Sequence, residues 1–372
     1  MSDMFPPHRL RTFAFLAILA AGCTEAELPP GDAGQPSQQA CAFTEVISPD
    51  QFDTTERSGV TTDGRVVFIG TRPAADGSIK SWLAEIVAGP SGGKPFVRDL
   101  LAGSLAGTSD GKLEGPASGD SCLFSGMATH GMLVYAACHA DDGRASLVQV
   151  DLTQKTVRAG DFTTCNKEPS ATPCKAIDMY PNGMAVDSHG RIYVSSMLAH
   201  LSGEQDAPTL VQIEVAAHPT EAQRLSFRHR GWLTSDIFAD GITPNGIQIE
   251  GETLYYAAGA NLNAVPILAD GSAGKMRLHY EGPSLSYIDD FAVREGAFVA
   301  ARTLPGDLTE LAPVTQGTFA RELGTCLLPH DATPSSVTRM PSPTPVTSVF
   351  AAGTYVVTSY FGGGLYTVSR LH

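Results

Sequence analysis

The sequence has few basic residues for its length. Its 372 residues include 25 Lys and Arg against 39 Asp and Glu, which gives a formal net charge of −14 at pH 7. Proteins that bind nucleic acid usually carry basic clusters on one face, so this balance argues against a nucleic-acid partner. The sequence also lacks a phosphate-binding loop and a dinucleotide-binding glycine fingerprint. Nothing in it therefore indicates a nucleotide cofactor.

The N-terminal region lacks an apolar run long enough to cross a membrane as a helix. Its apolar run covers residues 13–21, whereas a spanning helix needs about 20 apolar residues. The run follows the basic residues Arg9 and Arg11, an order that is typical of a signal peptide. We therefore expect residues 1–22 to be removed and to take no part in the fold.

The end of this apolar run, Ala20-Ala21-Gly22-Cys23, resembles the lipobox of bacterial lipoproteins. The resemblance implies that Cys23 is acylated and becomes the new N-terminus; ordinary secretory cleavage with loss of Cys23 is the alternative. Residues 23–40 are rich in Pro, Gly, Ser and Gln, a composition that favours a flexible tether. We expect an exported protein that is held to the cell envelope, on a periplasmic or outer face, through its lipid only.

Six cysteines remain after Cys23, and they are Cys41, Cys122, Cys138, Cys165, Cys174 and Cys326. An even number in an exported chain predicts disulfides, although the connectivity does not follow from the sequence. The candidate pairs are Cys165 with Cys174, Cys41 with Cys326, and Cys122 with Cys138. Buried free thiols remain the alternative for some of them, because a small apolar cysteine packs well in a core.

No long segment shows the 3.6-residue period of a helix, and a different pattern recurs six times between residues 41 and 372. Each copy starts with a small or polar residue, runs through apolar residues to a glycine turn, and continues into a β-branched and aromatic strand. The copies begin at Ser58, Ser125, Asn182, Asn245, Asp290 and Thr347, and their turn glycines are Gly64, Gly131, Gly190, Gly251, Gly296 and Gly353. Such a repeat predicts an all-β fold, a six-bladed β-propeller over residues 41–372. A β-sandwich also has short strands, but it would not repeat one motif six times.

Polar residues head three successive copies of this repeat. They are Asn182, Asn245 and Asp290, with Asp289 beside the last. The innermost strand of every propeller blade starts at the central channel, so we expect these side chains to converge near the axis. Amide and carboxylate oxygens suit a hard cation such as Ca²⁺, and the absence of convergent Cys or His argues against zinc.

The segments 181–187, 244–247 and 288–293 resemble the metal-binding blade heads of the gluconolactonase, or senescence-marker, family and of its paraoxonase relatives. The resemblance implies a Ca²⁺ ion, or another divalent cation, bound near the propeller axis. It implies Asn182, Asn245 and Asp290 as ligands, with Glu56 as a fourth and Asp289 as a possible further one. The alternative is that these residues only form turns before strands.

The same resemblance implies hydrolysis of lactones or related esters. The metal would polarise the lactone carbonyl and activate a water molecule, and Asp290 would serve as the general base. Paraoxonases use a pair of histidines, whose places here fall on Ser125 and His139. His139 is therefore a further catalytic candidate, and an ordinary loop residue is the alternative.

Two other functions remain open at this stage. A non-enzymatic propeller could bind a ligand or a protein, because one fold carries many functions. The second open function is a different reaction on the same scaffold, as in strictosidine-synthase-like proteins. The blade loops that would select a substrate carry no pattern that names one.

Overall fold

The computed structural model describes most of the chain after residue 40. The described ranges are 41–48, 51–73, 79–90, 93–102, 123–139, 145–162, 179–197, 208–216, 225–234, 244–312, 320–329, 332–341, 349–361, 363–369 and 371. The predicted signal peptide and tether, with Cys23, lie outside these ranges, as do Cys122, Cys165 and Cys174. The described strands all belong to the unit of residues 36–372. None of the described residues forms a helix that is long and apolar enough to span a membrane.

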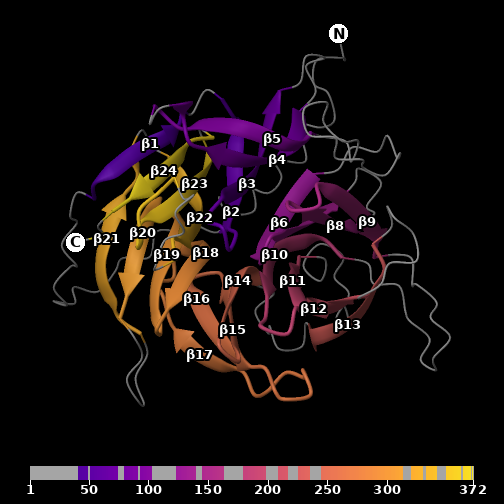
Figure 1. The fold of residues 1–372 in the computed structure, drawn as a ribbon. Coiled ribbons are helices and arrows are strands. Elements are labelled where there is room, and N and C mark those ends of the chain that lie inside the picture. The colour runs from indigo at the N-terminus through magenta and orange to yellow at the C-terminus, as the bar shows by residue number, and fades with distance from the viewer. Residues whose placement is uncertain are drawn as a thin grey trace, which may run out of the picture. The chain divides into compact units, whose positions relative to one another are not determined.

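Six antiparallel four-stranded sheets surround a common centre, so the fold is the predicted six-bladed β-propeller (Figure 1). Each blade takes the name of its innermost strand. The β2 blade contains β2 (Thr54–Val60), β3 (Val66–Pro73), β4 (Ile79–Val87) and β5 (Phe96–Ala102). The β6 blade contains β6 (Leu123–His130), β7 (Leu133–His139), β8 (Ala145–Asp151) and β9 (Thr156–Asp161). The β10 blade contains β10 (Pro181–Val186), β11 (Ile192–Ser196), β12 (Pro208–Val215) and β13 (Phe227–Thr234).

The remaining three blades complete the ring. The β14 blade contains β14 (Pro244–Glu250), β15 (Thr253–Ala258), β16 (Asn261–Pro266) and β17 (Arg277–Tyr280). The β18 blade contains β18 (Tyr287–Arg294), β19 (Ala297–Leu304), β20 (Asp307–Leu311) and β21 (Glu322–Leu327). The β22 blade contains β22 (Thr333–Arg339), β23 (Tyr355–Phe361), β24 (Leu365–Val368) and β1 (Phe43–Ile47). The six innermost strands contact one another in sequence around the axis.

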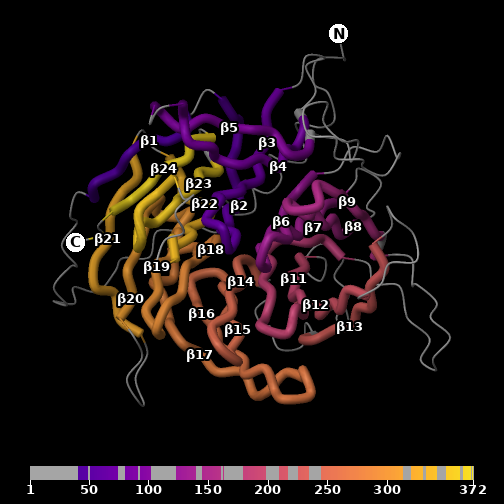
Figure 2. Tube along the Cα trace, in the orientation of Figure 1, coloured from indigo at the N-terminus to yellow at the C-terminus, as the bar shows by residue number. Residues whose placement is uncertain are grey.

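The last blade is built from both ends of the described chain. Strand β1 pairs antiparallel with β24, with Phe43 opposite Val368 and Ile47 opposite Leu365. Figure 2 shows the indigo β1 beside the yellow β24. The ring therefore closes through backbone hydrogen bonds between residues more than 300 positions apart in the sequence.

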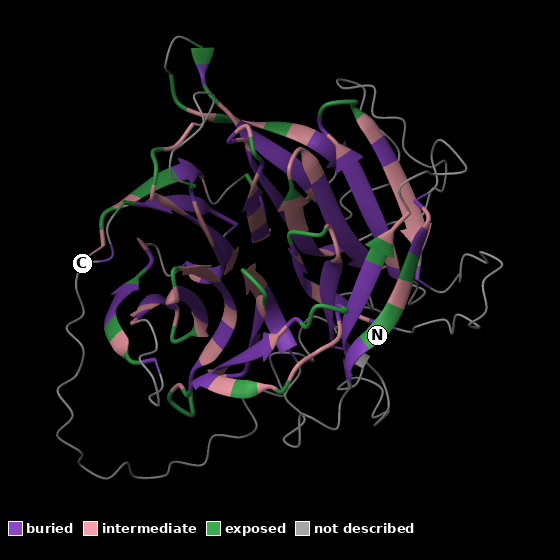
Figure 3. Cartoon of the chain, turned by 60° about the horizontal axis from the view of Figure 1, so that its bottom comes forward, coloured by how far each residue is buried: buried purple, intermediate pink, exposed green. Residues whose placement is uncertain are grey.

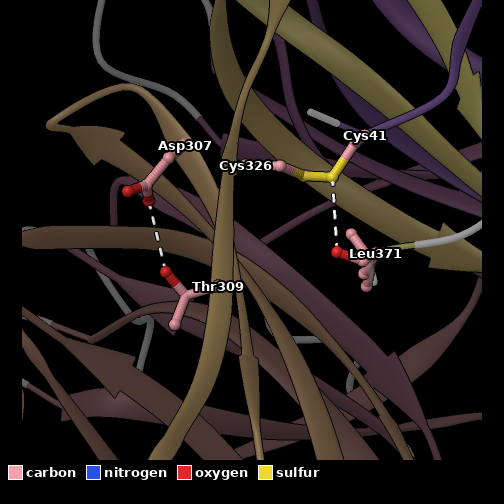
Figure 4. The surroundings of a disulfide bond; sticks show 5 residues. All are labelled: Cys41, Asp307, Thr309, Cys326 and Leu371. Atoms are coloured by element: carbon pink, nitrogen blue, oxygen red, sulfur yellow. Dashed lines mark hydrogen bonds between the residues drawn. A yellow bond between two sulfur atoms is a disulfide. The ribbon is translucent and has the colours of Figure 1, made fainter. Parts of the chain in front are cut away.

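A disulfide joins this closing blade to its neighbour. Cys41, just before β1, is bonded to Cys326 in β21 of the β18 blade, and the Cys41 sulfur lies 3.6 Å from the Leu371 carbonyl oxygen (Figure 4). The prediction of this pair is confirmed. Cys138 is also disulfide-bonded, and its partner lies outside the described residues. The pairing of Cys165 with Cys174 stays a prediction.

The core lies mainly between neighbouring blades. One cluster of buried side chains joins Tyr135 and Leu147 of the β6 blade to Met184, Val194 and Val211 of the β10 blade. Figure 3 shows the same trend, with buried residues along the strands and exposed ones at the turns. Each blade therefore needs its neighbours to cover its two faces, which is why a repeat of this length is stable only in a closed ring.

The repeat pattern locates five blades correctly and one only in part. The first five copies coincide with the first two strands of their blades. All six turn glycines have positive φ, from 59° at Gly251 to 83° at Gly64, a conformation that favours glycine. In the last copy, however, the inner strand is β22, and Val349 and Phe350 lie in a bend before β23. The connection between β22 and β23 is longer than in the other blades, so the spacing from Gly353 misplaced this strand.

Candidate functional site

All six innermost strands are irregular at the same level, close to their first residues. In each, the register with the second strand shifts within two or three residues; the shifts lie between Thr55 and Arg57, Phe124 and Gly126, Pro181 and Met184, Pro244 and Ile247, Ile288 and Asp290, and Pro334 and Ser336. A β-bulge leaves a residue out of the ladder and changes the direction of its side chain. The predicted ligands Glu56, Asn182, Asn245 and Asp289 all lie in these shifts.

Glycines at three of these register shifts allow neighbouring inner strands to approach each other closely. A Cβ atom at Gly126 would lie 2.1 Å from the Asn182 carbonyl oxygen, and one at Gly183 would lie 2.3 Å from that of Asn245. At Gly246 it would lie 2.4 Å from Asp290 Oδ1. The Asn-Gly pairs of the sequence thus serve packing at the axis, since no other residue fits there without displacement of the next strand.

The guanidinium of Arg57 lies among the predicted ligands. Its Nη1 atom is 2.6 Å from Asp290 Oδ2. Its Nη2 atom donates to Asn182 Oδ1 at 3.3 Å and to Asn245 Oδ1 at 3.2 Å, and lies 4.0 Å from Asp289 Oδ1. The structure therefore brings four of the five predicted ligands together, around a side chain that the sequence analysis did not consider.

Glu56, the fifth predicted ligand, is held by its backbone at the edge of this group. Its carbonyl oxygen accepts hydrogen bonds of 2.9 Å from Ser335 Oγ and from Thr358 Oγ1, both in the β22 blade. Burial raises the pKa of the Glu56 carboxyl to about 8, and the charge of Asp289 adds to the shift while Arg57 opposes it. Glu56 is partly exposed, so solvent reaches this residue.

The two adjacent aspartates have different surroundings. Asp290 is buried, with 3% of its side chain exposed, and its Oδ2 atom is engaged by Arg57. Asp289 has 19% of its side chain exposed, and its Oδ1 atom accepts a hydrogen bond of 2.6 Å from Asn245 Nδ2. Burial raises the pKa of Asp289 to about 6, with Arg57 opposing and Asp290 adding to the shift. Asp289 is therefore the aspartate of this pair that solvent reaches.

Three tyrosines border the same site. Burial raises the pKa of Tyr287 and of Tyr360 to about 12; the charge of Asp289 adds to the shift of Tyr287, and the charges of Glu56 and Asp289 add to that of Tyr360. Burial and the charge of Glu56 also raise the pKa of Tyr180. Tyr287 OH also accepts a hydrogen bond of 3.1 Å from Asn245 Nδ2. Tyr287 therefore keeps its proton at neutral pH and can donate it in a hydrogen bond.

The predicted catalytic residue His139 lies at the end of β7 and contacts one of these tyrosines. Its ring centroid is 4.1 Å from that of Tyr180. Ser125, at the other place of the paraoxonase histidine pair, donates a hydrogen bond of 2.6 Å to the Pro181 carbonyl oxygen. The catalytic role of His139 stays a prediction.

The arrangement does not fit a divalent cation at the predicted oxygens while Arg57 lies among them. A guanidinium presents only N–H donors and no lone pair, so Nη2 takes the amide oxygens that a Ca²⁺ ion would need as ligands. The described residues also contain no cluster of three or more His, Cys, Asp or Glu that could hold a metal ion. Calcium stays a prediction, and we derive no chemical step through it.

Among known proteins, similarity is found at the level of three-dimensional structure. No protein-family model matches the chain, and no curated protein matches its sequence significantly. A putative glucose dehydrogenase from Thermus thermophilus superposes with a TM-score of 0.50 at 13% identity, over 88% of this chain and 99% of that one. A gluconolactonase from Xanthomonas campestris superposes with a TM-score of 0.49 at 14% identity, over 92% and 99% of the two chains. At 13% identity, the first of these similarities shows the fold alone.

Proposed function

We propose that the axial site hydrolyses small lactones or related esters. The observation that carries this proposal is that two partly exposed acidic residues, Glu56 and Asp289, lie near each other, and that Asn245 Nδ2 links Asp289 to the hydroxyl of Tyr287. Carboxyls in such surroundings are typical of acid–base catalysis. The site also holds its groups firmly, because Asn245 connects Asp289 to Arg57 through its amide.

Asp289 takes the role of general base in this proposal, in place of Asp290. Its carboxylate is adjacent to solvent, whereas that of Asp290 is buried against Arg57. Asp289 accepts a proton from a water molecule while the water oxygen bonds to the carbonyl carbon. The tetrahedral intermediate then expels the ring oxygen, which takes that proton back from Asp289, so the product is a hydroxy acid.

The hydroxyl of Tyr287 supplies the complementary hydrogen bond to the substrate. Because Tyr287 OH accepts from Asn245 Nδ2, its own proton can be donated to the carbonyl oxygen, where negative charge develops. Donors fixed at that position stabilise the intermediate without reorganisation. Protonated Glu56 is the second candidate donor on the same side of the site.

The first experiment measures hydrolysis of aldonolactones, homoserine lactones and aryl esters by the purified protein, with added Ca²⁺ and then with chelator. Asp289→Asn should lower kcat on any accepted substrate by roughly 10²- to 10⁴-fold. Asp270→Asn, which changes an exposed carboxyl in the loop after β16, should leave kcat unchanged. Turnover by the wild type that survives in Asp289→Asn would contradict this assignment. Turnover lost with chelator would favour the calcium-dependent form of the proposal.

A binding function without catalysis is the second candidate. Leu285, Leu304 and Leu327 have 76, 43 and 54% of their surface exposed. Leu304 lies opposite Tyr287 and Leu327 opposite Asp307, so the three leucines lie at the end of the β18 blade that also carries Asp289. Exposed apolar side chains at this end of the blade suit contact with a ligand or a protein partner. This function is favoured if a compound of the panel raises Tm but is not converted.

A further inference from the structure

We infer that Arg57 is the resident cation of the axial site, and that this propeller holds its blade heads together without a metal ion. The inference concerns what occupies the site and does not depend on the proposed hydrolysis. Oxygens from three blades converge on one position, and a positive charge there is needed because Asp290 is buried beside it. In this chain the charge is provided by a residue of a fourth blade.

The contacts of Arg57 reach across the ring. Asn182, Asn245 and the Asp289 carbonyl lie 125, 188 and 232 positions away in the sequence and belong to the β10, β14 and β18 blades. Arg57 itself belongs to β2. One side chain therefore makes polar contacts with three other blades, which is the role that a central metal ion would have.

The backbone of β2 is fixed so that Arg57 can make these contacts. The register shift between Thr55 and Arg57 interrupts the ladder with β3. Ser335 Oγ donates to the carbonyl oxygens of Thr55 and Glu56, at 2.7 and 2.9 Å. Because the preceding residues are anchored to the β22 blade, the long Arg57 side chain crosses the axis from a defined starting point.

A calcium ion and Arg57 cannot share this position. Calcium ligands lie about 2.3–2.6 Å from the ion, so an ion bound to both amide oxygens would lie within a few ångströms of Nη2. The guanidinium remains charged under all ordinary conditions, and the repulsion is strong where water is excluded. Calcium binding at these oxygens would therefore require Arg57 to leave the site and expose its charge elsewhere.

Arg57 acts as a positioning residue rather than a catalytic one. Its Nη2 atom contacts Asn245 Oδ1, and the amide of the same Asn245 donates to Asp289 Oδ1. Loss of Arg57 should therefore disturb Asp289 and leave the buried Asp290 without its counter-ion. The empty space among the same oxygens would then resemble the calcium site that the sequence implies.

The test is calorimetric titration of the wild type and of Arg57→Ala with CaCl₂, together with Tm in Ca²⁺ and in chelator. A ligand at 100 times its Kd raises Tm by roughly 5 °C in a protein of this size. We expect the wild type to bind no stoichiometric Ca²⁺ and its Tm to change by less than about 1 °C between the two conditions. Arg57→Ala should melt at lower temperature and regain part of the loss in Ca²⁺.

Stoichiometric binding of Ca²⁺ by the wild type, with a rise in Tm, would overturn the inference. An equal response of Tm to Ca²⁺ in the wild type and in the variant would do so as well.

Arg191→Ala is the matched control, since it removes an arginine paired with Asp187 at 2.6 Å elsewhere in the β10 blade, and its Tm should not respond to Ca²⁺. If Arg57→Ala does not fold, the double variant Arg57→Met with Asp290→Asn removes both buried charges. It should fold and gain no response to Ca²⁺. All these readouts are independent of turnover, so they remain informative if no substrate is found.

Discussion

Two arginines of this propeller are equally buried, each with 5% of its surface exposed, and they have different kinds of partners. Arg302 lies in β19 and contacts Asp307 through Nε and Nη2, at 2.6 and 2.7 Å, and Glu322 through Nη1 at 2.8 Å. All three residues belong to the β18 blade. Arg57 instead contacts residues of three blades other than its own.

The difference distinguishes an ion group that stabilises one blade from a polar group that forms only when several blades meet. Arg302 contacts two carboxylates, Asp307 in fork geometry and Glu322 through one nitrogen, five and 20 positions away in the sequence, so one blade contains the whole ion group. Arg57 has one carboxylate at close range, and two neutral amides accept from its other end. Only closure of the ring brings these groups together, and the partly exposed carboxyls adjoin this second arginine.

The largest effect is expected at the arginine within a blade. Arg302→Ala leaves Asp307 and Glu322 without their partner, and breaking a buried ion pair in this way costs about 3–5 kcal/mol of unfolding free energy. Urea unfolding measures this loss. Activity per folded molecule should remain that of the wild type, because the ion-pair partners of Arg302 are Asp307 and Glu322 rather than Asp289 or Asp290. A parallel loss of Asp289-dependent turnover in Arg302→Ala would remove the distinction between the two arginines.

The disulfide tests a covalent contact between blades. Replacing both Cys41 and Cys326 by Ala opens a cross-link between residues 285 positions apart, and removal of a disulfide typically costs about 2–5 kcal/mol. The expected result is a lower urea midpoint with unchanged kcat, since the bond lies away from the inner strands. Each single Ala variant should lose as much stability as the double variant. A clearly smaller loss in one of the single variants would show that the bond is not the source of the effect.

The most gradual effect is a pH dependence at a contact between two blades. His279 of β17 packs against Tyr255 of its own blade and against Phe298 of the β18 blade, at centroid distances of 5.3 and 4.7 Å. Burial lowers the pKa of His279 to about 4, and Arg277 adds to the shift. Between that value and the unfolded value of about 6.5, the unfolded chain binds more protons. Stability should therefore fall as the pH drops from about 6.5 to about 4, by up to about 1.4 kcal/mol per pH unit.

Comparison with His279→Phe isolates this contribution. Phenylalanine keeps an aromatic ring beside Tyr255 and Phe298 and cannot titrate, so its unfolding free energy should depend less on pH in this range. Urea unfolding at pH 4.5, 5.5 and 6.5 measures the two slopes. Equal slopes in the two proteins would show that His279 is protonated as readily in the folded state as in the unfolded one.

The sequence pattern located the blades because each blade is a local structure. A turn glycine with positive φ and a β-branched strand after it recur within a few residues, and these preferences act over short distances. The pattern failed in the last blade, where residues 340–354 separate β22 from β23. Strand pairing over a longer loop depends on contacts with the neighbouring blades. The spacing of residues along the chain does not predict these contacts.

The candidate site was predictable in its acceptors but not in its cation. The repeated Asn-Gly pairs and the Asp289-Asp290 pair indicated which oxygens would meet, and Glu56 was placed beside them. Arg57 follows Glu56 directly, and it could have been predicted as well. An arginine next to an expected ligand is itself a candidate hydrogen-bond donor to the converging oxygens. Nothing in the sequence pattern predicted Tyr180 and Tyr287 at the site, apart from their positions just before blade heads.

By itself, the sequence determined the composition of the repeat and therefore an all-β ring of six blades, because turn and strand preferences are local. It also determined which polar residues head the blades. Only the tertiary structure decided which cysteine pairs with Cys326, which aspartate is exposed, and what lies among the converging oxygens. These outcomes depend on distances between residues more than 100 positions apart, and such distances exist only after β1 has paired with β24 and closed the ring.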